Sequence, residues 1–152
     1  MATPTVVEAQ IEVGCSLPGV FQATIDVPRW RKWQVRFVEV EKVSPGEFAL
    51  GTKIRTVSEA LGKRYEMLSE VTEFSLNEKV TFAGSSETLS YSSTWSFESV
   101  TDETTKVAVR MESRANAGAV LARLVHPWLT GVFRKRLEAD LESFKVMLEA
   151  GL

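Results

Sequence analysis

The chain has 152 residues, of which 44% are hydrophobic and 25% charged, and its formal net charge is −2. This composition is typical of a globular protein and excludes a disordered or fibrous one. The length predicts a single domain over residues 1–152, because domains usually contain about 100–200 residues. Domains that bind nucleic acids generally contain more basic than acidic residues, so the negative net charge argues against a nucleic-acid partner.

Cys15 and His126 are the only cysteine and the only histidine. An intrachain disulfide and a zinc site built from several such ligands are therefore excluded, and we expect neither a metal nor a cofactor. The first residues lack the charged and apolar regions of a signal peptide, and no apolar stretch reaches the roughly 18 residues of a membrane span. We expect a cytoplasmic protein with no membrane span.

The first predicted element is a strand, in which apolar residues alternate with polar ones from Val7 to Cys15. A short helix should follow, with Ser16 as its N-cap residue and Pro18 in its first turn. Pro28 interrupts this helix, and the segment after it has room for one more helical turn.

That last turn belongs to residues 27–35, "VPRWRKWQV", in which two tryptophans stand among basic residues. Such a pattern occurs on nucleic-acid-binding surfaces, where bases stack on aromatic rings. It also occurs where a short helix buries its tryptophans and exposes its charges. We favour the second interpretation, with Trp30 and Trp33 as apolar plugs and the cations facing outward: Arg29, Arg31, Lys32 and Arg36.

Six further strands are predicted, separated by turn signals such as Pro45-Gly46 and Leu76-Asn77. They cover residues 35–43, 52–60, 63–74, 79–84, 89–100 and 105–114. The short connections predict an antiparallel meander with one covered face. The alternation assigns these residues to the covered face: Tyr65, Met67, Ser69, Val71, Tyr91, Ser93, Trp95, Val109, Met111 and Ser113.

A long helix is predicted over residues 119–150. Its apolar residues form two stripes, whereas a straight amphipathic helix carries one. One stripe contains Leu121, Val125, Trp128 and Val132, and the other contains Phe133, Leu137, Leu141, Phe144 and Leu148. The change coincides with Pro127, so we expect a kink or break there. The second half should pack on the sheet while the first half faces something else.

The same helix carries a basic run at 134–136. Arg134 and Glu138 are four residues apart, as are Arg136 and Asp140. Opposite charges at this spacing are typical of a solvated helix face, so we assign these residues to the surface.

The order of strand, two short helices, six strands and long helix is the helix-grip arrangement. The chain resembles the START-like superfamily, also called SRPBCC, and most closely its polyketide cyclase/dehydrase and lipid-transport branch. The resemblance covers nearly the whole chain and rests on these segments: "LPGVFQATIDVPRW" at 17–30, Trp33, Gly51-Thr52, "VTEF" at 71–74 and "LESFKVMLE" at 141–149. It implies an α+β fold in which a curved, seven-stranded antiparallel sheet wraps around the C-terminal helix and leaves a cavity.

Members of this superfamily bind lipids, sterols, polyketides or other apolar molecules, so the resemblance implies an apolar ligand in that cavity. The alternative at this stage is a filled core, in which the same side chains pack against one another. The predicted ligand-binding residues are Trp33, Tyr65, Met67, Tyr91, Ser93, Trp95, Val109, Met111, Leu121, Val125, His126 and Trp128. No catalytic residue is identified. His126 either acts as an acid or base at the cavity mouth, or it has no chemical role and caps carbonyls beside Pro127 or points to solvent, and we favour the second interpretation.

Three functions are therefore considered. The first is binding of a hydrophobic or amphipathic small molecule, lipid- or polyketide-like. The second is a polyketide cyclase or dehydratase in the same cavity, with Tyr65, Tyr91 or His126 moving protons. The third is a partner-binding module resembling activators of the Hsp90 ATPase, which share the fold. Whether identical copies associate stays open.

Overall fold

The structure is a computed structural model that describes residues 4–60, 62–86, 89–115 and 119–151. For Ala60, Ala115 and residues 119–129 the backbone alone is described. Seven strands, three α-helices and one 3-10 helix are assigned within these residues. In chain order they are β1 (Thr5–Val13), α1 (Leu17–Ile25), η1 (Val27–Arg29), α2 (Trp30–Trp33), β2 (Phe37–Lys42), β3 (Lys53–Ala60), β4 (Lys63–Ser75), β5 (Lys79–Ser85), β6 (Leu89–Thr101), β7 (Thr104–Ala115) and α3 (Ala119–Glu149).

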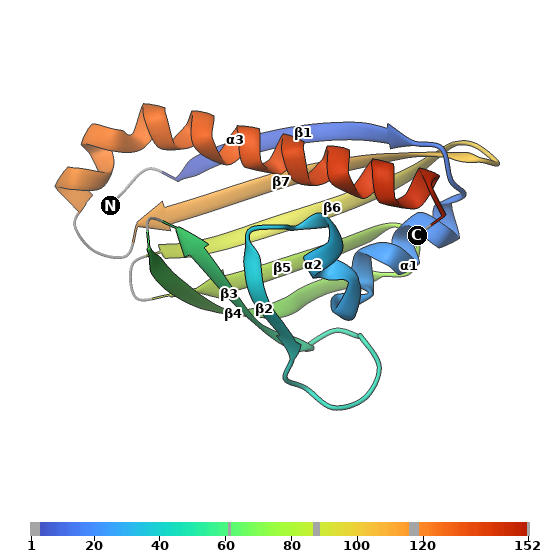
Figure 1. Ribbon diagram of the computed structural model, residues 1–152, viewed down its shortest axis with the longest axis horizontal. Helices are drawn as coiled ribbons and strands as arrows, with labels where there is room; N and C mark the ends of the chain where they lie inside the picture. Colours follow the sequence, from blue (N-terminus) through green and yellow to red (C-terminus); the bar gives the residue numbers. More distant parts are fainter. Residues whose placement is uncertain (1–3, 61, 87–88, 116–118, 152) are drawn as a thin grey trace.

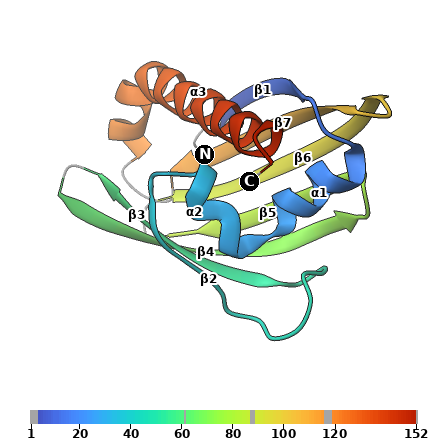
Figure 2. The ribbon, with the colours of Figure 1, turned by 45° about the vertical axis from the view of Figure 1, so that its right-hand side comes forward.

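All seven strands belong to one sheet with the order β1-β7-β6-β5-β4-β3-β2, and every neighbouring pair is antiparallel. The order follows from the hairpin connections of β2 to β7, together with β1 pairing to the last strand. The sheet curls so that its two edge strands approach the same helix, and α1 and α2 lie on its concave side (Figures 1 and 2). The predicted α+β helix-grip fold is confirmed.

The turns of the sheet lie where the sequence places turn residues. Gly62 joins β3 to β4 with φ of 76°, and Asn77 joins β4 to β5 with φ of 61°. Glycine adopts positive φ without a steric penalty, and asparagine is among the residues that tolerate it best. At the end of β1 the prediction was too long, because the strand ends at Val13 instead of continuing to Cys15.

Helix α1 begins after Ser16, as predicted, but the Ser16 side chain makes no capping hydrogen bond. The proline at the start of the helix needs no hydrogen-bond acceptor there, since it has no N–H. Phe21 on the buried face of α1 is fully buried, and its ring lies 5.2 Å from that of Phe97 in an edge-to-face contact. Helix α1 therefore seals one end of the concave face.

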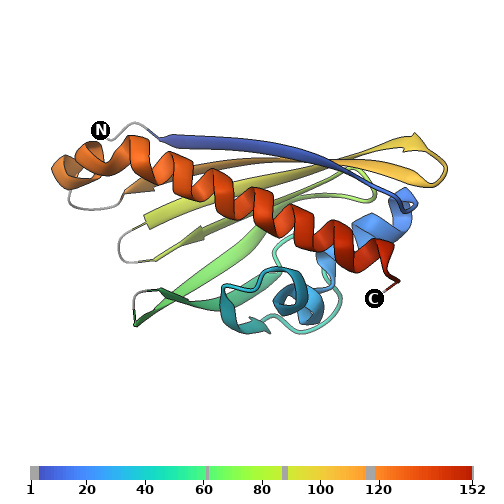
Figure 3. The ribbon, with the colours of Figure 1, turned by 45° about the horizontal axis from the view of Figure 1, so that its top comes forward.

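Helix α3 is continuous from Ala119 to Glu149, so it does not break at Pro127. Its first turns are inclined to the rest of the helix (Figures 1 and 2), and the remainder runs along β1 (Figure 3). Lys145 donates to the carbonyl of Glu12 at 2.8 Å, and Glu149 accepts from the Gly14 N–H at 2.7 Å. These bonds attach the end of α3 to the end of β1.

The second half of α3 packs on the sheet, as expected. Leu137, Leu141 and Phe144 are buried in the core, at 3%, 1% and 0% exposure. The side chains of the other proposed stripe, Leu121, Val125 and Trp128, lie outside the part of the chain whose side chains are described. What the first half of the helix faces therefore stays a prediction.

Candidate functional site

The strand register arranges the concave face of the sheet in rows, because directly paired residues of neighbouring strands point to the same side. One row runs across five strands and is polar: Thr5, Ser113, Tyr91, Gly84 and Ser69. The row through Trp95 is apolar: Ala9, Val109, Trp95 and Val80. We call the first the polar row. It lies at the end of the sheet where β1, β4 and β6 begin.

Tyr91 is the central residue of the polar row. Its phenol oxygen lies 2.6 Å from the hydroxyl of Ser69, which belongs to β4, although β5 runs between the two strands. The residue of β5 between them is Gly84, and a Cβ atom there would lie 2.6 Å from Cε1 of Tyr91 and 2.9 Å from Oγ of Ser69. The missing side chain of Gly84 therefore makes room for the ring to cross β5.

The environment of Tyr91 favours the neutral phenol. Burial raises the pKa of Tyr91, and the hydrogen bond with Ser69 and the positive charge of Arg36 offset part of the rise. A phenol with a raised pKa stays protonated at neutral pH and can donate a hydrogen bond.

Arg36 is the charged residue in the chain segment between α2 and β2. We expected it to face outward, but this is wrong. Its guanidinium makes an ion pair and hydrogen bond with the carboxylate of Asp140 on α3, and it lies 4.7 Å from the centre of the Phe37 ring. The side chain of Arg36 is 30% exposed and that of Asp140 only 11%. The pair therefore links the start of the edge strand β2 to the helix.

Asp140 was likewise assigned to the surface from its spacing to Arg136, and this too is wrong, because it is buried. Burial raises the pKa of the Asp140 carboxyl, while the charges of Arg36 and Arg136 and the hydrogen bond from Arg36 offset part of the rise. A buried carboxylate needs such a partner, since an isolated one is costly in a low-dielectric interior.

The two tryptophans of the 27–35 segment are buried plugs, as predicted. Trp30 is 7% exposed and donates from Nε1 to the carbonyl of Thr24 at 2.9 Å. Trp33 is 1% exposed, and its ring lies 4.7 Å from that of Phe144 and 5.6 Å from that of Trp95. The buried indole N–H of Trp33 has no hydrogen-bond acceptor among the described residues. These rings join α2, α3 and β6 in one aromatic cluster.

The predicted ligand-binding residues fall into three groups. Trp33, Ser93, Trp95 and Val109 are buried with the core. Four others keep solvent contact on the concave face: Tyr65, Met67, Tyr91 and Met111. The last four lie where side chains are not described: Leu121, Val125, His126 and Trp128. The register places the second group on the concave face, toward the end where β4 and β6 begin, and we call these four residues the accessible end.

Residues that the site prediction missed are Arg36, Asp140 and Gly84. Asp140 carried a usable signal, because it stands three residues after Leu137 and four before Phe144, within the buried stripe of the helix. An acidic residue in an apolar stripe indicates a buried partner. For Arg36 and Gly84 no local pattern was informative, since their partners are distant in the chain.

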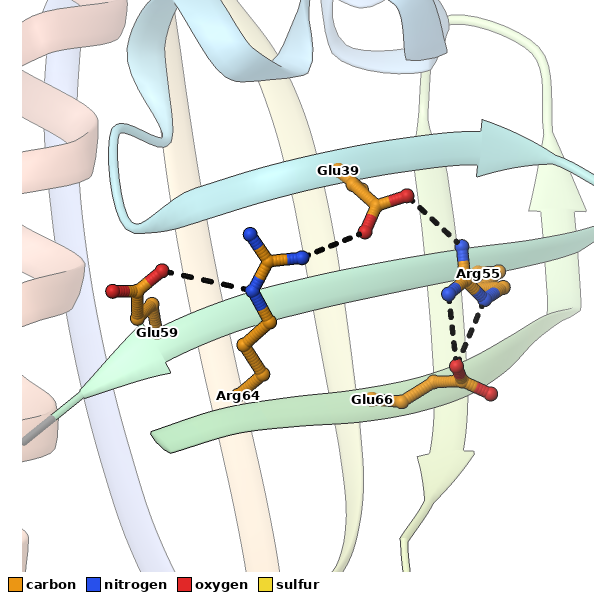
Figure 4. A network of polar contacts seen from close by, with 5 residues as sticks. All are labelled: Glu39, Arg55, Glu59, Arg64 and Glu66. Carbon is orange, nitrogen blue, oxygen red and sulfur yellow. Dashed lines mark hydrogen bonds and ion pairs between the residues drawn. The ribbon is translucent and has the colours of Figure 1, made fainter. Parts of the chain in front are cut away.

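The convex face of β2, β3 and β4 is charged instead. A network of ion pairs covers it (Figure 4), formed by Glu39, Arg55, Glu59, Arg64 and Glu66. Arg55 lies 2.9 Å from Glu66, and the register places Val57 beside Glu66 on the same face. Val57 is only 4% exposed, so the long charged side chains shield it from water. The convex face of β2, β3 and β4 is therefore a surface of paired charges, whereas the accessible end consists of aromatic and apolar side chains.

Neither a metal nor a membrane span is indicated by the described residues. They contain no group of three or more His, Cys, Asp or Glu side chains placed to hold a metal ion. None of the helices in this part of the chain is both long and apolar enough to cross a bilayer.

A long helix held by a curled antiparallel sheet defines the helix-grip class of proteins. Residues 4–149 match the family model described as polyketide cyclase / dehydrase and lipid transport. Because the match spans nearly the whole chain, the protein belongs to this family. No curated protein matches the sequence.

Solved structures agree on the fold. The Zhui aromatase/cyclase from a Streptomyces species superposes with a TM-score of 0.82 at 14% identity, over 97% of this chain and 94% of that one. A START superfamily protein from Mycobacterium smegmatis gives a TM-score of 0.73 at 14% identity, over 94% of this chain and 98% of that one. A protein from Thermus thermophilus superposes with a TM-score of 0.78 at 18% identity, over 96% of this chain and 98% of that one. At such identities the likeness concerns the fold.

Proposed function

We propose that this protein binds a hydrophobic or amphipathic small molecule, lipid- or polyketide-like, on the concave face of the sheet at the accessible end. The observation that carries the proposal is the incomplete burial of large side chains on the concave face of the sheet. Tyr65 is 49% exposed, and Met67, Tyr91 and Met111 are half-buried. In a filled core such side chains would be sealed, as Phe97 and Val107 are at the other end.

The chemistry of these side chains supports the same conclusion. Ligand sites for apolar molecules combine hydrophobic and aromatic walls with a few polar groups that fix orientation. Here two methionines supply adaptable apolar surface, and the polar row supplies hydroxyls beside them. Membership of a family that includes lipid transport is consistent with such a ligand.

The proposal is tested with an apolar fluorescent probe whose emission rises on leaving water. Met67 and Leu68 are neighbours on β4 that point to opposite faces, so Met67→Trp and Leu68→Trp form a matched pair. We expect Met67→Trp to fill the accessible end and to weaken probe binding about tenfold, equivalent to about 1.4 kcal/mol. Leu68→Trp should leave binding unchanged. No uptake by the wild-type protein, or equal uptake by both variants, would contradict the proposal.

A polyketide cyclase or dehydratase is the second candidate, and the position of Tyr91 favours it. Residue Tyr91 keeps some solvent contact, its raised pKa holds the phenol in the protonated form, and the charge of Arg36 acts on it, so the phenol is suited to hydrogen-bonding and polarising a ligand oxygen. Incubation with a short poly-β-ketone thioester, followed by mass spectrometry, would detect loss of water from the substrate. Turnover that Tyr91→Phe abolishes while probe binding persists would favour this candidate over a pure carrier.

A further inference from the structure

The charge balance beside the accessible end restricts what the polar end of a ligand can be. Arg36 precedes Phe37, which pairs with Ser58 on β3, and Ser58 pairs in turn with Tyr65 on β4. The backbone of Arg36 therefore lies at the same end of the concave face as Tyr65, and the positive charge of its guanidinium acts on Tyr91. From there the guanidinium reaches Asp140 on the buried side of α3.

The ion pair is already neutral before any ligand arrives. Nη1 of Arg36 is bonded to Oδ2 of Asp140, and the Asp140 side chain is largely withdrawn from water. A ligand carboxylate placed on Arg36 would lie close to the Asp140 carboxylate, and like charges near one another in a poorly solvated site repel strongly. Arg136 also acts on Asp140, but it is exposed, so solvent screens its charge.

A neutral oxygen meets no such repulsion. The guanidinium of Arg36 has further N–H donors besides the one bonded to Asp140. Either hydroxyl can be the donor in the bond between Ser69 and Tyr91, and when Ser69 donates, the neutral phenol of Tyr91 is free to donate to a ligand as well. A carbonyl or hydroxyl oxygen accepts from these groups without adding a charge. Each hydrogen bond from a charged donor is stronger than one between neutral groups.

We propose that the Arg36–Asp140 pair makes the protein select ligands whose polar end is an uncharged oxygen, a carbonyl or hydroxyl, over carboxylates of the same chain length. Arg36 is the donor to the ligand oxygen, and Asp140 is the countercharge that excludes anions. This inference rests on the proposed function and adds to it the chemical class of the ligand head group.

The test uses dodecanol and dodecanoate at neutral pH, each displacing the apolar fluorescent probe. For the wild-type protein we expect dodecanol to bind about tenfold more tightly than dodecanoate. Asp140→Asn removes the countercharge and should reverse the order, because the anion then meets an unpaired guanidinium. Glu142→Gln is the matched control, since it makes the same change of charge on an exposed position of the same helix. It should leave the preference unchanged.

Arg36→Gln provides a second variant in case Asp140→Asn fails to fold. It should weaken dodecanol binding and weaken dodecanoate binding further, because Asp140 then stands without its cation. A wild-type preference for dodecanoate, or a preference that neither variant shifts, would overturn the inference while the proposed function stands. If the wild-type protein takes up no probe at all, the proposed function itself fails, and the inference fails with it.

Discussion

The two ends of the concave face are built by the same strands but have different surroundings. At one end Phe97 of β6 and Val107 of β7 lie beneath Phe21 of α1, and all three are buried. At the other end Tyr91 and Met111 continue the same two strands on the same face, yet both keep contact with solvent. The strand pattern is the same at both ends, so the covering element decides which end becomes core. Helix α1 covers the first end closely.

This difference predicts that truncating a side chain to alanine lowers the free energy of unfolding by different amounts at the two ends. The largest loss is expected at the end where α1 packs on the sheet. Phe21→Ala removes a ring that contacts Phe74 and Phe97 edge-on, at 5.8 Å and 5.2 Å. We expect a loss of about 3–5 kcal/mol in the free energy of unfolding, measured by urea denaturation. Leu76→Ala, at a position that is 66% exposed, is the control and should change stability by less than about 0.5 kcal/mol. Equal losses would mean that the first end is not sealed.

The polar row can be tested through Gly84, where the expected effect is smaller. Gly84→Ala puts a methyl group 2.6 Å from the Tyr91 ring, and overpacking of this kind costs about 1–3 kcal/mol. In a Tyr91→Ala background the additional cost should fall, because the ring is gone. Gly131→Ala is the control, since a Cβ atom at that position in α3 meets no other side chain of the described residues within 4 Å, and it should stabilise by about 0.5–1 kcal/mol. If Gly84→Ala costs the same stability in the Tyr91→Ala background as in the wild-type protein, the Tyr91 ring does not cross β5 at Gly84.

The smallest effect concerns the bond between Tyr91 and Ser69. Tyr91→Phe should lower the free energy of unfolding by about 0.5–1.5 kcal/mol, as expected for loss of one hydrogen bond. Tyr65 and Tyr91 are the only tyrosines, so in a Tyr65→Phe protein the absorbance of the phenolate reports on Tyr91 alone. Its pKa should lie above the ordinary value of about 10, and Ser69→Ala should raise it further.

The sign of the accompanying stability change follows from linkage. The folded-state pKa of Tyr91 is raised, so the folded protein binds this proton more tightly than the unfolded chain does. The resulting stability is fully present below pH of about 10 and is lost as the pH rises through the folded-state pKa. A phenol that titrates at its ordinary value, with no effect of Ser69→Ala, would show that Tyr91 is solvated rather than held in the polar row.

The fold could be predicted well from the sequence because its signals are local. Alternation over 89–100 and 105–114 identifies β6 and β7 and assigns Trp95 and Val109 to one face, and turn residues such as Asn77 mark the hairpins. Half of the site was predictable for the same reason. Met67, Tyr91 and Met111 are on the concave face by strand periodicity alone.

The polar contacts of the site were decided by the tertiary structure. Arg36 and Asp140 are 104 residues apart in the chain, and each resembles an ordinary surface charge beside its own neighbours. Tyr91 and Ser69 are 22 residues apart and meet only because β5 presents a glycine between them. Periodicity determines which face of a strand or helix a side chain occupies, since it depends on the local backbone alone. Which partner meets that side chain depends on how the sheet curls against α3, and no local pattern records that curvature.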